Sequence, residues 1–252
     1  EGAGQPLLLL HGFTGSAAAW GPALPALARR CRVLAVDLPG HGASDAPADP
    51  ARYAMERVAA DLLSLLARRD ALPALWLGYS MGGRLALYVA ARHPAAVRAL
   101  LLESASPGLA TAAARAERRA ADEALATRIE TEGVARFVAE WERRPLFAGL
   151  ERLPAEARAA LHRQRLANAA AGLANSLRGM GTGAQPSLWP DLGQVAAPAQ
   201  LLAGEEDTKF EDITRRMAAA MPVDTQRLVA GAGQTIHLER PNAFLAAVEG
   251  FL

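Results

Sequence analysis

Short runs of apolar residues recur along the chain, and each run ends in residues that favour turns. The runs carry almost no charge and do not alternate with polar residues, which is typical of strands buried on both faces of a sheet. Turn formers such as His-Gly, Asp-Leu-Pro-Gly and Gly-Glu-Glu-Asp follow them. The pattern predicts strands at residues 7–10, 32–36, 74–77, 99–103, 200–203 and 225–229.

Stretches with helical spacing separate these runs. Residues 53–69 place Met55, Val58 and Leu62 on one face, which predicts an amphipathic helix. Further helices are expected at 84–92 and 241–251, and at 17–29 with an early interruption by prolines. Alternation of strand and helix predicts an α/β fold, with a mostly parallel central sheet and helices on both faces.

The residue pattern changes between residues 111 and 180, where no strand-like apolar run occurs. Ala-, Arg- and Glu-rich helical stretches fill this region, with breaks near Gly133, Pro145 and Pro154. We interpret the region as an inserted helical cap. The predicted division is a core of residues 1–107 and 190–252 with a cap of residues 108–189.

Composition narrows the class of protein. The 252 residues are 51% hydrophobic, enough for one sizeable core. A net charge of +1, from 27 basic and 26 acidic side chains, provides no field that would recruit nucleic acid or an anionic membrane. No apolar run reaches the roughly 18 residues of a membrane span, and no signal peptide is visible. A cytoplasmic location is expected.

Two residue types are nearly missing. Cys31 is the single cysteine and is expected to be a small core residue rather than a nucleophile. Lys209 is the single lysine, so an anion site in this chain would be built mainly from arginine, whose planar fork binds carboxylates in a bidentate way.

Candidate chemistry centres on residues 78–82, which read Gly-Tyr-Ser-Met-Gly between a predicted strand and a predicted helix. This G-x-S-x-G pattern in that context is typical of a nucleophile elbow, with Ser80 at its tip. The turn is so tight that the residues two positions away must lack a Cβ, and both are glycine. The helix that follows aims its first N–H groups at the serine and favours negative charge there.

Two other loops supply the expected partners of Ser80. His-Gly-Phe at residues 11–13 follows the first strand, so the backbone N–H groups of Phe13 and Met81 are candidates for an oxyanion hole. Asp207 follows a later buried strand, where an acid that orients a catalytic base is expected.

The base position breaks the pattern. Gln234 occupies the place after the last strand where Gly-x-Gly-His is expected, and glutamine has no group that titrates near neutral pH. His237, three residues on, is either a displaced base or a structural residue, and its distance along the chain favours the structural role. Gln234 itself fits either natural loss of the base or an engineered change made to trap a ligand.

The chain resembles the 2-succinyl-6-hydroxy-2,4-cyclohexadiene-1-carboxylate synthases of menaquinone biosynthesis, which are lyases of the α/β-hydrolase fold. The elbow and the Asp-Leu-Pro-Gly-His-Gly loop are shared across the superfamily, whereas Arg84, the Trp-Glu-Arg-Arg-Pro-Leu-Phe segment and Asp-Thr-Lys-Phe are more specific to these synthases. The matching segments run almost from end to end, at residues 9–16, 37–44, 78–84, 103–109, 115–118, 141–147 and 204–210.

The resemblance implies a 2,5-elimination that expels pyruvate from a cyclohexene with several carboxylates. It also implies that Ser80 acts as a base through a histidine partner and that no acyl-enzyme is needed. No metal-ligand cluster, Walker loop or dinucleotide fingerprint occurs in the sequence, so no cofactor is expected. The implied partner is a small polycarboxylate; oligomeric state is left open. The implied catalytic positions are Ser80, Asp207 and Gln234, and the implied substrate-binding residues are Tyr79, Arg84, Arg118, Trp141, Phe147 and Arg165.

Two other functions stay open at this point. The same scaffold supports hydrolysis of carboxylic esters or of carbon–carbon bonds. A binding protein that has lost catalysis is the second alternative, and Gln234 is the direct reason to consider it.

Overall fold

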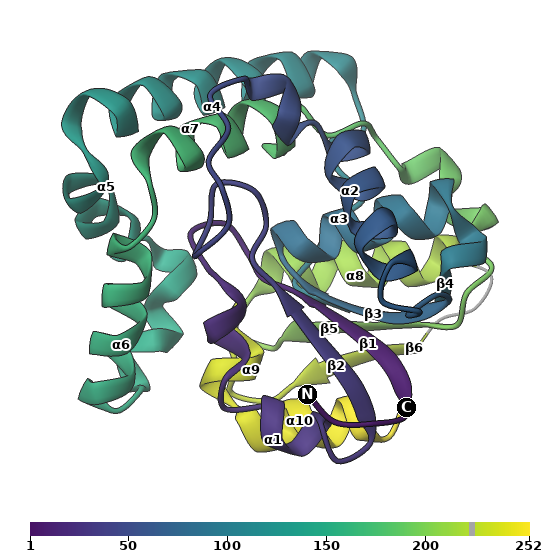
Figure 1. Ribbon diagram of the computed structural model, residues 1–252. Helices are drawn as coiled ribbons and strands as arrows, with labels where there is room; N and C mark the ends of the chain where they lie inside the picture. Colours follow the sequence, from purple (N-terminus) through teal and green to yellow (C-terminus); the bar gives the residue numbers. More distant parts are fainter. Residues whose placement is uncertain (222–224) are drawn as a thin grey trace.

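A six-stranded parallel sheet forms the centre of the computed structural model, which describes residues 1–221 and 225–252 (Figure 1). The strands lie in the order β2-β1-β3-β4-β5-β6, and each neighbouring pair is parallel. Every predicted apolar run lies within a strand, so the predicted fold class is confirmed. The strands are β1 (Gln5–Leu10), β2 (Cys31–Val36), β3 (Ala74–Tyr79), β4 (Val97–Glu103), β5 (Ala199–Gly204) and β6 (Thr225–Val229).

Helices cover both faces of this sheet because side chains of each strand alternate between the faces. Leu8, Trp76 and Leu100 belong to the core on one face, under α2 (Met55–Ala67), α3 (Met81–Arg92) and α8 (Thr208–Ala220). Leu9 and Leu77 belong to the core on the opposite face. The elements on that face are α1 (Leu24–Leu27), α9 (Ile236–Glu239), α10 (Pro241–Glu249) and the 3₁₀ helix η1 (Ala17–Trp20).

The helix expected at 17–29 is two short pieces, η1 and α1, because prolines at 22 and 25 interrupt it. Short 3₁₀ helices η2 (Pro50–Tyr53), η3 (Pro94–Ala96) and η5 (Trp189–Gln194) lie in the connections. Cys31 is buried at the start of β2, and burial raises the pKa of its thiol, as suits a small core residue. No helix of the described residues is both long and apolar enough to span a bilayer.

All elements between β4 and η5 in the described chain are helical. They stand on the side of the sheet toward which the strands' carboxyl ends point (Figure 1). Helices α4, α5 and α7 share a small apolar core of their own around Ile129, Phe137 and Leu173. The elements are α4 (Ala112–Glu132), α5 (Val134–Trp141), the 3₁₀ helix η4 (Pro145–Arg152), α6 (Ala155–Leu166) and α7 (Ala170–Met180).

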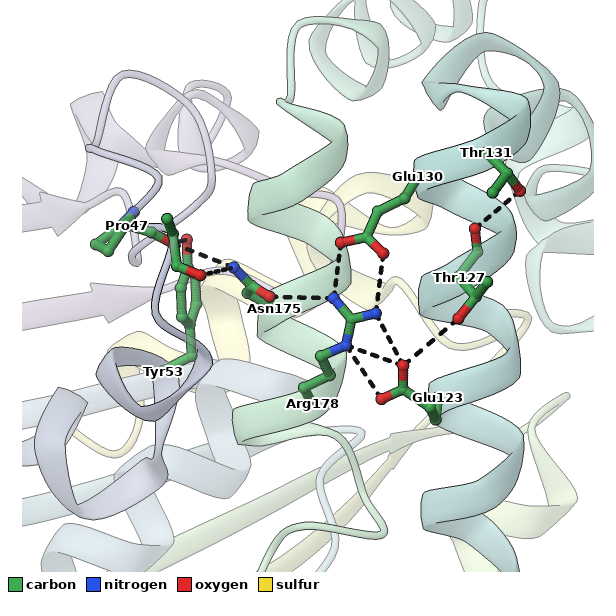
Figure 2. Close-up of polar contacts among 9 residues, drawn as sticks. Pro47, Tyr53, Glu123, Thr127, Glu130, Thr131, Asn175 and Arg178 are labelled. Atoms are coloured by element: carbon green, nitrogen blue, oxygen red, sulfur yellow. Dashed lines mark hydrogen bonds and ion pairs between the residues drawn. The ribbon is translucent and has the colours of Figure 1, made fainter.

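An ionic clasp, formed by Arg178 with Glu123 and Glu130, joins α7 to α4 (Figure 2). The guanidinium lies 2.8 Å from a Glu123 oxygen and 2.7 Å from a Glu130 oxygen. One turn away on α7, the amide of Asn175 donates to the backbone carbonyl of Pro47 at 3.2 Å. Polar contacts therefore join α7 both to α4 and to the loop that carries Pro47.

Candidate active site

Ser80 lies at the sharp turn between β3 and α3, with backbone φ of +49°. This left-handed conformation is costly for serine and is held by close packing on both sides. A Cβ on Gly78 would lie 2.5 Å from the carbonyl carbon of Gly82, and a Cβ on Gly82 would lie 2.3 Å from the carbonyl oxygen of Leu10. Both flanking glycines are thus required by contact, as the elbow motif predicts.

The loop after β1 lies against this elbow. The N–H of Gly82 donates to the carbonyl of His11 at 3.1 Å, and Phe13 and Met81 line the same cavity as Ser80. Among the described residues no backbone carbonyl accepts a hydrogen bond from the N–H of Phe13 or of Met81. Two free N–H groups beside the serine are the arrangement that stabilises a developing oxyanion.

The histidines of this region are neutral structural groups. Leu38 donates its N–H to Nε2 of His11 at 3.0 Å, so the proton of that ring is on Nδ1, which faces the carbonyl of Gly12 at 2.8 Å. Burial lowers the pKa of His11, and burial together with His11 lowers the pKa of His41 to about 3. Neither imidazole lines the cavity of Ser80.

Asp207 begins α8 as its capping residue. Its Oδ1 accepts the N–H of Phe210 at 3.2 Å, whereas its Oδ2 is buried with no partner among the described residues. Burial raises the pKa of this carboxyl, opposed by the Phe210 hydrogen bond and by Lys209. A buried carboxylate oxygen without a donor is ready to accept one.

Gln234 lies in the wall of the cavity that Ser80 lines and is almost fully buried. Its Oε1 also has no partner within the described chain. The loops that carry the two residues touch, because the N–H of Glu206 donates to the carbonyl of Ala232 at 2.9 Å. The structure thus brings the acid loop and the residue-234 loop together, with an orphaned oxygen on each side chain.

His237 lies elsewhere. Its Nδ1 is 2.9 Å from both carboxylate oxygens of Glu103, and its ring stacks against Trp20 at 4.5 Å and meets Tyr79 edge-on at 5.0 Å between centroids. The imidazole does not line the cavity of Ser80. This placement favours the structural role over that of a displaced base.

Four hydrogen bonds fix the main chain around residue 234. Glu239 accepts the N–H of Gly233 at 2.7 Å and of Thr235 at 2.9 Å. Ser104, itself at a left-handed φ of +48°, donates its hydroxyl to the carbonyl of Gln234 at 2.8 Å, and Glu103 accepts the N–H of His237 at 3.1 Å. All four bonds are to backbone atoms, so the position is held whatever its side chain.

A cavity of about 410 Å³ opens above Ser80, between the sheet edge and the helices that follow β4. Of the described residues that line it, five carry a positive charge and none carries a carboxylate. The cations are Arg84, Arg118, Arg144, Lys209 and Arg216. Of the predicted site residues, those in the lining are Phe13, Tyr79, Ser80, Met81, Arg84, Arg118, Trp141, Phe147 and Gln234.

The predicted arginines differ in their surroundings. Arg84 is buried, and burial, with repulsion from Arg118, lowers its pKa to about 10. Arg118 is half-exposed and donates its Nε to Asp122 at 2.7 Å. The guanidinium of Arg84 is the more desolvated of the two, so a contact with an anion there is the stronger one.

Arg165 is not in the lining of this cavity. Its Nη1 pairs with Glu142 at 3.0 Å, and its Cζ lies 4.9 Å from the ring centroid of Phe147. Phe147 lines the cavity on one side and an outer pocket on the other, and Arg165 lines the outer one. Arg165 also lines a small pocket next to Phe13 and Tyr79, two residues that line the cavity of Ser80.

Three cationic lining residues were absent from the predicted set. Arg144 lies with its Cζ 4.4 Å from the centroid of Trp141, and Arg216 lies with its Cζ 4.5 Å from the centroid of Trp189. Lys209 stands two residues after Asp207, and this nearness to a predicted catalytic position could have identified it as a site residue. In contrast, nothing in the sequence around Arg216 separates it from the exposed Arg215 beside it. No cluster of metal-ligating side chains occurs in the described part of the chain.

Comparison with known proteins places this geometry in a family. A family model described as alpha/beta hydrolase fold matches residues 5–241. The chain is 41% identical over 250 residues to a putative 2-succinyl-6-hydroxy-2,4-cyclohexadiene-1-carboxylate synthase of Bacillus subtilis (strain 168), covering 99% of this chain and 91% of the relative. It is 38% identical over 251 residues to the synthase of that name from Serratia proteamaculans (strain 568), covering 98% and 92%.

A solved structure agrees with these relatives. The structure of MenH from S. aureus superimposes with a TM-score of 0.94 at 36% sequence identity, over 98% of this chain and 93% of the other. The similarity thus extends over nearly the whole of this chain.

Proposed function

We propose that this chain, which belongs to the family of 2-succinyl-6-hydroxy-2,4-cyclohexadiene-1-carboxylate synthases within the α/β-hydrolase fold, binds the family's polycarboxylate substrate in the cavity above Ser80. The substrate is 2-succinyl-5-enolpyruvyl-6-hydroxy-3-cyclohexene-1-carboxylate, and the reaction is elimination of pyruvate. Gln234 at the base position makes this chain a slow catalyst that retains the binding site.

The observation that carries the proposal is the charge of the cavity. Five cations and no carboxylate line it in the described chain, around a serine at a strained elbow. Such a site attracts a ligand with several negative charges and repels cations, whereas a neutral ester would gain little from it. Trp141 and Phe147 add an apolar wall suited to a cyclohexene ring.

The chemistry assigned to each group follows from the elimination. A base removes the proton from the ring carbon next to the succinyl ketone, and the electron pair becomes an enolate whose oxygen accepts N–H bonds from Phe13 and Met81. The enolate then re-forms the ketone, the ring double bond shifts so that a conjugated diene forms, and the ring carbon–oxygen bond breaks. Its electron pair leaves with the enolate of pyruvate, which takes up a proton on its terminal carbon to give pyruvate. Ser80 is placed to take the ring proton if a neighbour accepts its own.

Gln234 limits the proton-transfer step of this proposed reaction. An amide neither accepts a proton near neutral pH nor carries one to Asp207. Proton transfer from Ser80 must then go to water, which lacks the fixed orientation of an imidazole. A non-catalytic ligand-binding role is the second candidate, and Gln234 is the observation that favours it.

Replacement of Gln234 by histidine tests the proposal. We expect Gln234→His to raise the rate of pyruvate release by ~10²–10⁴-fold, the usual contribution of general base catalysis. The substrate Kd should change by less than about threefold, because the cations are untouched. Pyruvate is measured with lactate dehydrogenase and NADH, and Kd by calorimetry.

Gln234→Ala is the matched control and should show no gain. Gln234→His combined with Ser80→Ala should lose the gain. Tight binding with no gain from Gln234→His would support the non-catalytic role. Burst release of p-nitrophenol from p-nitrophenyl esters, without pyruvate release, would instead favour an ester hydrolase.

A further inference from the structure

Arg84 is held in place by neutral groups only. Its Nη1 donates to the backbone carbonyl of Met180 at 2.8 Å and to Oε1 of Gln185 at 2.9 Å. The nearby carboxylate of Asp122 is engaged elsewhere, with Arg118 at 2.7 Å and the N–H of Gly183 at 3.3 Å. A buried guanidinium with neutral partners keeps its full charge available to a ligand.

Gln185 is fully buried, and its amide orientation follows from its neighbours. Arg84 can only donate, so the atom that faces it is the oxygen. The amide nitrogen then faces the carbonyl of Ser106 at 3.4 Å, in the loop after β4. Gly108, at φ +85°, packs against this amide, since a Cβ there would lie 3.2 Å from its carbon.

Two other arginines of the predicted site, Arg118 and Arg165, have acidic partners. Arg118 pairs with Asp122, and Arg165 pairs with Glu142. Their charges are largely balanced in the folded protein before any ligand arrives. Arg84 differs from both because a carboxamide stands where a carboxylate of nearly the same shape would fit.

We propose that Gln185 is a positioning residue that holds Arg84 toward the cavity without neutralising it, so that Arg84 binds one substrate carboxylate with its whole charge. The inference rests on the proposed function, because it takes a carboxylate of that substrate as the ligand of Arg84. It assigns the anion preference of this end of the cavity to residue 185 as well as to the arginine.

Two substitutions separate a role in charge from a role in packing. Gln185→Glu keeps the acceptor for Arg84 and adds a negative charge, whereas Gln185→Met keeps the volume and removes both hydrogen bonds. If the charge matters, Gln185→Glu should raise the substrate Kd by about tenfold or more, and Gln185→Met by clearly less. The dependence of Kd on NaCl concentration should also weaken in Gln185→Glu alone, because one fewer uncompensated cation meets the ligand.

Binding is measured by calorimetry on the full chain, with circular dichroism melts to confirm folding of each variant. The double variant Arg84→Met with Gln185→Glu should bind no more weakly than Arg84→Met alone, since the two residues act through one contact. A Kd and a salt dependence for Gln185→Glu that equal those of the unmodified chain would overturn the role of Gln185 and leave the proposed function standing. A larger loss in Gln185→Met than in Gln185→Glu would reduce residue 185 to packing. Absence of substrate binding by the unmodified chain would overturn both proposals.

Discussion

The carboxylate of Glu103 binds His237 twice, through the backbone N–H at 3.1 Å and through the imidazole Nδ1 at 2.9 Å. Both side chains are fully buried, and 134 positions separate them in the sequence. The pair joins the end of β4 to α9, directly beside the loop that carries Gln234.

Removal of the imidazole should therefore lower the stability of the fold and leave the catalytic rate unchanged. We expect His237→Ala to lower the free energy of unfolding by about 3 kcal/mol, because Glu103 is left buried without its partner. The measurement is urea unfolding at pH 7. His162→Ala, whose exposed ring pairs with Glu142, is the control and should cost less than about 0.5 kcal/mol.

The same substitution distinguishes the two roles considered for His237. In the Gln234→His background, at a temperature where His237→Ala is folded, kcat should stay within about threefold of the parent. A fall of ~10²-fold or more in the folded variant would instead make His237 a base.

Asp207 predicts a pH-dependent penalty on stability. Burial raises its pKa, so the folded state holds this proton more tightly than the unfolded chain does. Ionised Asp207 therefore lowers the free energy of unfolding above the raised pKa. The penalty vanishes below the ordinary aspartate pKa, where both states are protonated.

At pH 7, Asp207→Asn should accordingly raise the free energy of unfolding by ~0.5–2 kcal/mol. The variant should therefore unfold at a higher temperature than the unmodified chain. Asparagine also caps a helix well, so the bond from Phe210 is kept. Melts from pH 3 to 8 test this, and the two curves should converge at the acid end. A constant difference at every pH would mean that the charge of Asp207 is not its cause.

Arg144 and its neighbour Arg143 form a natural test pair for the cavity. Arg144 lines the cavity over Trp141 and has no acidic partner in the described chain. Burial lowers its pKa, and repulsion from Arg118 and Arg128 lowers it further. Arg144→Met should raise the substrate Kd by about tenfold. Arg143→Met should change Kd by less than about twofold, because Arg143 is exposed and outside the lining. Equal effects in calorimetric titrations would point to the general field of the cap.

The ionic clasp of Arg178 predicts a salt-dependent contribution to stability. The hydrogen bonds that Arg178 donates to Glu130 and Glu123 raise its pKa, and its side chain is only 21% exposed. Arg178→Met should cost about 1 kcal/mol at 0.05 M NaCl and clearly less at 1 M, where such pairs are screened. Arg128→Met removes a side chain that is 48% exposed and pairs with Glu132 and Glu140, and it should cost clearly less than Arg178→Met. Thermal melts at both salt concentrations provide the measurement, and a cost of Arg178→Met that is independent of salt would contradict it.

The parts of this molecule that follow local rules could be predicted. Period, turn residues and strand length are local properties, so all six strands and the elbow at Ser80 were found from them. Helix boundaries in the cap followed Gly133 and the prolines for the same reason.

Contacts between distant segments could not be predicted in this way. The pairing of Glu103 with His237 and of Arg84 with Gln185 depends on how segments more than 100 positions apart in the sequence meet in the fold. The surroundings of Arg165 could not be predicted from the sequence either. The family resemblance implies that this arginine binds substrate, and in the structure its guanidinium lies 4.9 Å from the ring centroid of Phe147 and pairs with Glu142. Its role as a substrate ligand stays a prediction.

The backbone bonds around residue 234 separate foldability from reactivity at this corner of the protein. None of the bonds that Glu103, Ser104 and Glu239 make in this loop involves the side chain of residue 234, so we expect the loop to keep its shape when that side chain is changed. If the proposed function holds, a single substitution at residue 234 is enough to convert a catalyst into a ligand-binding protein, and no second substitution is needed to preserve the fold.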